Sequence, residues 1–207
     1  MSSLPRFTLP GKWGRVDLSN EASSRRSIRK ITETVTGRRE ELAMVRAELR
    51  SRFQTAADLA REGGASDLYV AFELVKGIPL PAWLTVFSPT IESTDFAALG
   101  LDALKTVLDL GAASNDPQVT QRTTDVEGNK IHAVRQSWRR QRQISEGQTE
   151  SSFEFLEADY WLATTGPNRI ALLTFSTALA EYEEQMLALF DAVISTIRWA
   201  GRPKTTS

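Results

Sequence analysis

The chain has 207 residues, of which 41% are hydrophobic and 25% are charged, and these values are typical of a soluble globular protein. It contains no cysteine, which excludes disulfides, thiolate metal sites and thiol catalysis. The net charge of -1 combines an excess of five positive charges in residues 1–62 with an excess of six negative charges in the remaining residues. Such segregation can mark an interaction surface, although solvated helix faces produce it more often.

The first third of the chain predicts one strand and two helices. The strand is expected over Trp13–Leu18, and Asn20 is a suitable cap for a helix that runs to about Thr36. A second helix follows and ends at Gly63-Gly64, because glycine terminates helices readily. Its apolar residues recur at steps of three and four and form one stripe: Leu42, Val45, Leu49, Phe53, Ala56 and Ala60.

The rest of the chain predicts six further strands and two further helices. The strands are expected at Asp67–Lys76, Ala82–Ser88, Val119–Val126, Lys130–Gln141, Phe153–Thr164 and Arg169–Thr177, the helices at Phe96–Leu110 and Glu181–Trp199, and a polar loop at Ser145–Ser151. Strands joined by short turns pair antiparallel, and the helices need a sheet face on which to bury their stripes. The predicted fold class is therefore α+β: an antiparallel sheet of about six strands with helices packed on it in an α/β/α sandwich.

The closing helix carries the clearest pattern. Seven apolar residues lie on one side of it, and we expect them to be core: Tyr182, Met186, Leu189, Phe190, Val193, Ile194 and Ile197. The helix follows an apolar strand with a Phe175-Ser176 step and ends in the sequence FDAVISTIRW, from Phe190 to Trp199. An early strand that contains tryptophan, Lys12–Leu18, precedes both.

This combination resembles the end of PsbP-like domains, including the DcrB and actinobacterial LpqN-like branches. The resemblance covers some thirty residues and consists of core positions, so it concerns the fold more than the function. It implies an α/β/α sandwich and a mostly non-catalytic role as accessory subunit, adaptor, secretion-associated chaperone or lipoprotein. The chain differs from the lipoproteins because it lacks the lipobox cysteine.

The expected organisation is one such domain over residues 1–200, with a helical insertion at about 20–62 and a disordered tail at 201–207. The first residues contain no uninterrupted apolar stretch, and no window is long enough to cross a bilayer. We therefore expect a cytoplasmic protein without a signal peptide or membrane insertion.

Catalytic motifs are scarce. The one histidine, His132, lies in a predicted strand, where such a residue is usually structural, and an enzyme that uses it with a nearby carboxylate is the weakest hypothesis. The hydrolase elbow, the dinucleotide fingerprint and the P-loop are all missing. We expect no enzyme, no cofactor and no metal site. The acidic residues Glu150, Glu154, Glu157 and Asp159 fit a solvated sheet face better than a cation site.

Two groups of arginines could form nucleic-acid sites. One is Arg135, Arg139, Arg140 and Arg142 around Trp138, and the other lies in the first helix and after it. The sequence pI of about 6.0 argues against nucleic acid. For the first group we expect ion pairs across the sheet to the strand that holds Glu154, Glu157 and Asp159.

The leading hypothesis is a protein-binding module, such as an adaptor, a chaperone or an antidote-type binder, with a protein partner and an unassigned oligomeric state. Its partner-binding residues would be Arg25, Arg26, Arg29, Arg38 and Arg39. The alternative is a small-ligand-binding protein with a pocket between sheet and helices. Its lining would include Trp83, Trp138 and Trp161, although strand tryptophans are more often core.

Overall fold

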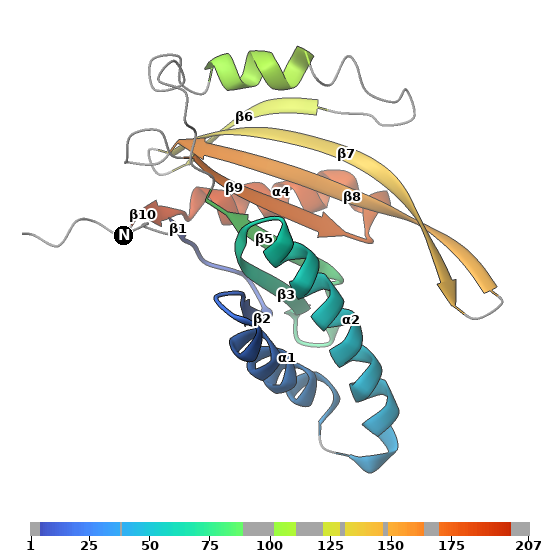
Figure 1. Ribbon diagram of the computed structural model, residues 1–207. Helices are drawn as coiled ribbons and strands as arrows, with labels where there is room; N and C mark the ends of the chain where they lie inside the picture. The colour runs from blue at the N-terminus through green and yellow to red at the C-terminus, as the bar shows by residue number, and fades with distance from the viewer. Residues whose placement is uncertain are drawn as a thin grey trace, which may run out of the picture.

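Eight strands form one antiparallel sheet, and seven of them follow one another across it, in the computed structural model, which describes residues 5–37, 39–88, 102–110, 122–128, 131–146, 149–163 and 170–199 (Figure 1). Their spatial order is β2 (Lys12–Asp17), β3 (Ala65–Val75), β5 (Ala82–Phe87), β9 (Ile170–Thr177), β8 (Thr149–Ala163), β7 (Ile131–Glu146) and β6 (Arg122–Gly128). The short β4 (Ile78–Pro79) pairs with β3. Apart from this sheet, β1 (Pro5–Arg6) pairs with β10 (Arg198–Trp199).

Helices flank the sheet. Between β2 and β3 the chain forms α1 (Glu21–Thr36), the 3-10 turn η1 (Glu40–Leu42) and α2 (Ala43–Glu62), which lie against each other and project from one end of the sheet in Figure 1. After β9 come η2 (Ala180–Tyr182) and α4 (Glu183–Ser195). Residues 102–110 are also helical. No described helix is long and apolar enough to cross a membrane.

The predicted α+β fold with helices on an antiparallel sheet is confirmed. The polar loop predicted at Ser145–Ser151 is wrong, because β7 continues to Glu146 and β8 begins at Thr149. Beyond Arg140 these two strands pair only with each other among the described residues, and Figure 1 shows this ribbon extending past the sheet. The ends of β7 and β8 were not predicted as strands because their sequence is polar, and a strand pair outside the core lacks the apolar alternation that identifies strands.

The two sides of the sheet differ because successive strand residues point to opposite faces. We name the side that carries Leu84, Tyr160 and Phe175 the α4 face, since these residues share a core cluster with Phe190 and Ile194 of α4. The ring of Phe190 stacks on Phe175 with centroids 4.4 Å apart. Full burial of such side chains contributes about 1.5–3 kcal/mol each, so this cluster is a main source of stability. The expected core stripe of the last helix is confirmed except at Tyr182, which is 51% exposed.

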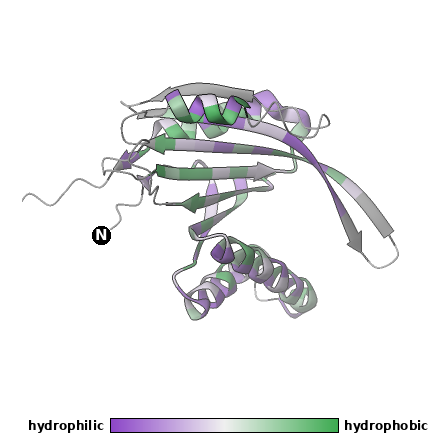
Figure 2. Cartoon of the chain, turned by 45° about the horizontal axis from the view of Figure 1, so that its top comes forward, coloured by the Kyte–Doolittle hydropathy of each residue, from purple (hydrophilic) through white to green (hydrophobic). Residues whose placement is uncertain are grey.

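The opposite side, which we name the α1–α2 face, carries Leu68 and Val70, which pack with Ile28, Ile31 and Phe53 of the two helices. The helix α1 lies so close to β2 that a Cβ at Gly14 would come within 2.6 Å of Ile31 Cγ1. The predicted stripe of α2 is buried at Phe53 only, and Val45 is 45% exposed. In Figure 2 the central strands are largely hydrophobic, whereas both helices carry hydrophilic residues as well.

Candidate functional site

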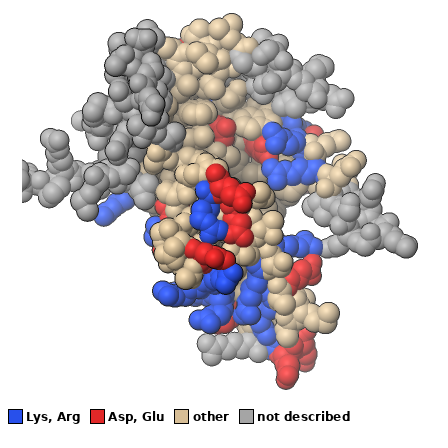
Figure 3. Space-filling view, in the orientation of Figure 1, with Lys and Arg blue, Asp and Glu red and all other residues tan. Residues whose placement is uncertain are grey.

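A basic surface covers the solvent side of α1. Asn20 starts this helix by accepting a hydrogen bond from Ser23 N at 2.9 Å, and Ile28 and Ile31 bury one side of it. The helical repeat then turns the cations outward, and all of them are exposed. We name this set the α1 basic face: Arg25, Arg26, Arg29 and Lys30. Figure 3 shows Lys and Arg side chains gathered over the region where Figure 1 places α1 and α2.

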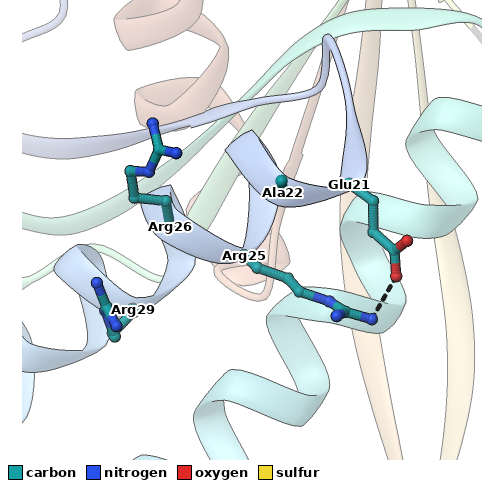
Figure 4. Close-up of a pocket in the computed structure, with 5 residues that line it drawn as sticks. All are labelled: Glu21, Ala22, Arg25, Arg26 and Arg29. Carbon is teal, nitrogen blue, oxygen red and sulfur yellow. Dashed lines mark hydrogen bonds and ion pairs between the residues drawn. The ribbon is translucent and has the colours of Figure 1, made fainter.

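An open depression of about 450 Å³ lies on this surface, lined by Glu21, Ala22, Arg25, Arg26 and Arg29. Figure 4 shows Arg25 directed toward Glu21, while Arg26 and Arg29 are directed away from that pair. The depression therefore has one neutralised flank and one cationic flank.

The charges on the cationic flank are not balanced within the molecule. Arg25 pairs with Glu21, but the side chains of Arg26, Arg29 and Lys30 make no hydrogen bond or ion pair with any residue that the structure describes. On the neighbouring α2, hydrogen bonds from Arg61 and Gln54 lower the pKa of Asp58, and Arg25 adds a smaller effect in the same direction. The unneutralised part of the surface can therefore attract an anionic group.

The structure separates Arg39, another predicted partner-binding residue, from this surface. Arg39 comes after Gly37, beyond the C-terminal end of α1, and its carbonyl oxygen accepts a hydrogen bond from Arg46 at 3.1 Å. Arg38 lies outside the described residues.

The three predicted ligand-binding tryptophans share the α1–α2 face. Trp83 and Trp138 lie in one row across four strands, because Trp83 is opposite Ser176, Ser176 is opposite Glu157, and Glu157 is opposite Trp138. Trp161 lies on β8, four residues from Glu157 along the strand. Trp83 packs against the core cluster of α1 and α2. The indole nitrogens of Trp138 and Trp161 are shielded from solvent and have no hydrogen-bond partner.

The acidic residues of β8 fall on both faces. The predicted cross-strand ion pairs are confirmed for two of the three acids: Arg139 lies 3.2 Å from Glu154, and Arg142 pairs with Glu157. The prediction is wrong for Asp159, which forms no ion pair with a described residue. The interpretation as a solvated face is wrong for Glu157, which is 5% exposed. It is also wrong for Asp159, because burial raises the pKa of this carboxyl to about 6, against a hydrogen bond from Thr174 that lowers it. Both residues lie in the middle of the sheet, where neighbouring strands exclude water.

A polar contact on the α4 face escaped the sequence analysis. The Tyr160 hydroxyl donates to Asp191 Oδ1 at 2.6 Å, and Arg135 pairs with the other oxygen of the same carboxylate. Asp191 lies between Phe190 and Ala192 in the closing helix. An acidic residue within an apolar stripe is the sequence feature that could have predicted a buried polar contact with a strand. This contact fixes α4 to the sheet.

No cluster with three or more metal-ligating side chains occurs among the described residues. His132 lies on β7 with Glu127 as its register partner on β6. Comparisons of the chain with protein-family models and with curated proteins gave no match.

Proposed function

We propose that this chain is a non-catalytic, cytoplasmic protein-binding module that holds the acidic surface of another protein on its α1 basic face. The observation that carries the proposal is the set of exposed cations on α1, of which Arg26, Arg29 and Lys30 have no partner among the described residues. A partner that supplies carboxylates would neutralise them, and such complementarity accelerates association and selects the partner.

Two further features support this role. The depression gives the partner a recessed place to insert a side chain, since it is open and bordered by arginines. The resemblance of the closing strand and helix to PsbP-like domains points the same way, because that family consists mostly of adaptors, chaperones and accessory subunits.

The test is a double charge reversal, Arg26→Glu with Arg29→Glu, compared with the wild type in pull-downs from native lysate. We expect one acidic protein to be recovered stoichiometrically with the wild type and lost with the variant. Binding to the purified partner should weaken as salt rises, because exposed charges are screened.

The matched control is Arg6→Glu with Arg198→Glu, which changes the net charge equally at two exposed residues that face each other on β1 and β10. This control should keep the partner. Equal losses in both variants, or recovery of no stoichiometric protein by the wild type, would contradict the proposal.

A further inference from the structure

The unneutralised charge of the α1 basic face is concentrated at one depression. The residues that line this depression are Glu21, Ala22, Arg25, Arg26 and Arg29. Three arginines against one glutamate leave two positive charges, and the ion pair of Arg25 with Glu21 assigns them to Arg26 and Arg29. Residues three positions apart on a helix are neighbours, with Cβ atoms about 5–6 Å apart. The two exposed guanidinium groups can therefore reach the same anionic group.

The charge and shape of these two side chains favour a phosphate group over a carboxylate. One carboxylate carries a single negative charge and would leave one of the two arginines unneutralised. A phosphorylated side chain carries a charge of about −1.5 to −2 at pH 7 and presents three acceptor oxygens. A guanidinium donates through a planar fork that binds two oxygens at once, so Arg26 and Arg29 can hold one phosphate together. Lys30 adds a third exposed cation next to them.

The small extent of the surface favours one phosphate group over a polyanion. Proteins that bind nucleic acids commonly contact about 6–10 phosphates along the backbone. Here the cations occupy six residues of one helix, from Arg25 to Lys30, with Glu21 before them and Glu33 after them. A nucleic acid or an anionic membrane would extend over these carboxylates. A single phosphate held by Arg26 and Arg29 lies on the flank that is directed away from Glu21 (Figure 4).

We propose that the α1 basic face binds a phosphorylated side chain, such as a phosphoserine, of the partner protein. The inference rests on the proposed protein-binding function and names the group that this surface holds. Arg26 and Arg29 donate forked hydrogen bonds to the phosphate oxygens, and Lys30 contributes charge without a fixed geometry. Association then depends on the phosphorylation state of the partner, so the reactions that add and remove this phosphate switch the complex on and off.

Two synthetic peptides test the preference for phosphate. One carries a single phosphoserine between glycines, and the other carries glutamate in its place. Both are titrated at pH 7 and low salt, and binding is followed through the backbone amide signals of Arg26 and Arg29 in a ¹H–¹⁵N spectrum. The phosphoserine peptide should bind about tenfold or more tightly, because it forms additional charge-assisted hydrogen bonds. Equal affinities, or no saturable shift with the phosphoserine peptide, would overturn the proposal.

The variant Arg26→Lys with Arg29→Lys separates the forked hydrogen bonds from the charge. It keeps both positive charges, so its affinity for the glutamate peptide should change by less than about twofold, whereas its affinity for the phosphoserine peptide should fall by about fivefold or more. The matched control is Arg6→Lys with Arg198→Lys, which makes the same change at two exposed residues of β1 and β10 and should bind both peptides as the wild type does. Wild-type affinity of the Arg26→Lys, Arg29→Lys variant for the phosphoserine peptide would overturn the assignment to these two arginines.

Other sources of phosphate are tested with a short single-stranded DNA and with vesicles of phosphatidylcholine and phosphatidylserine. Both should bind more weakly than the phosphoserine peptide, and tighter binding of either would overturn the proposal.

Pull-downs from lysate treated with phosphatase keep this inference separate from the protein-binding role. The partner should be lost after the treatment. Recovery of the same partner from treated and untreated lysate would overturn the phosphate inference and leave the protein-binding role standing. Recovery of no partner from untreated lysate would contradict the protein-binding role, and the affinities for the two peptides would still decide whether the surface prefers phosphate.

Discussion

Alternate residues of β8 and β9 build two faces of opposite character from the same strands. On the α4 face the side chains are fully buried and almost all apolar: Leu156, Ala158, Tyr160, Leu162, Ala171, Leu173 and Phe175, each 0% exposed. On the α1–α2 face they include carboxylates, hydroxyls and an indole: Glu157, Asp159, Trp161, Thr174 and Ser176. The polar atom of Tyr160 has a partner, whereas those of Asp159 and Ser176 include atoms without one.

The difference shows that the two faces of one sheet can contribute unequally to stability. The α4 face supplies the burial that the fold needs, and the hydroxyl of Tyr160 is bonded within the protein. The α1–α2 face of the same strands keeps buried polar atoms of Asp159 and Ser176 that have no partner among the described residues. Four changes would break or sharpen this contrast.

The largest effect is expected at Leu173, which is 0% exposed on the α4 face. Leu173→Ala should lower the free energy of unfolding by about 2–5 kcal/mol, because it leaves a cavity in the main core. The control is Leu172→Ala, the adjacent residue on the other face, which is only partly buried and should cost about 1 kcal/mol. Urea denaturation of both variants measures the difference, and equal losses would show that the two faces contribute alike.

The next effect depends on pH. The pKa of Asp159 is about 6 in the folded protein and 3.8 in its ordinary state, so folding favours the protonated carboxyl. Its contribution to stability is complete below pH 4 and is lost as the pH rises through 6. Asp159→Asn does not titrate, so its advantage over the wild type should grow by about 2 kcal/mol between pH 4 and pH 7. Urea denaturation across this range provides the measurement, and a constant difference would contradict the burial of this carboxyl.

A smaller loss is expected for Tyr160→Phe on the α4 face. The variant removes the hydroxyl that donates to Asp191 at 2.6 Å, and a hydrogen bond to a charged group contributes about 1.5–3 kcal/mol. Tyr182→Phe is the control, because Tyr182 is 51% exposed and should change the unfolding free energy by less than about 0.5 kcal/mol. A Tyr160→Phe variant as stable as the wild type would mean that this contact does not hold α4 on the sheet.

The smallest effect is expected for Ser176→Ala. Its buried hydroxyl has no partner, so its removal should change stability by less than about 0.5 kcal/mol. Ser24→Ala removes a buried hydroxyl that donates to Asp17 O at 2.8 Å and should cost about 1 kcal/mol. Thermal melts of the two variants measure the difference in stability. An equal loss of stability in both variants would show that Ser176 has a hydrogen-bond partner within the protein.

The strands and helices of the sheet were predictable because their core residues alternate or recur at helical spacing. The strand Ile170–Thr177 and the helix Glu183–Ser195 are examples. The pairing of β5 with β9 was not predictable, because nothing local to these strands specifies a neighbour about ninety residues away. The N-terminal part of α2 is more exposed than the prediction of a buried stripe implied. An apolar stripe shows which residues can be buried, but not what covers them.

For the candidate sites, the sequence indicated residue types but not their neighbours. The arginines of α1 were identified because consecutive cations on a helix stand out. Trp138 and Trp161 were named for their size, yet their grouping with Asp159 and Ser176 depends on the register of three strands. Asp159 was assigned to a solvated face because a carboxyl within a charged segment gives no local sign of burial.

The position of β9 has a consequence for synthesis on the ribosome. Among the described strands, β2, β3 and β5 join the later group β6, β7 and β8 only through β9, which lies between β5 and β8. Until residues 170–177 have emerged, the nascent chain presents two half-sheets, each with an open edge that can pair with other chains. Chains truncated before β9 should therefore aggregate, and a chaperone that shields strand edges would act on this protein only until translation has passed that point.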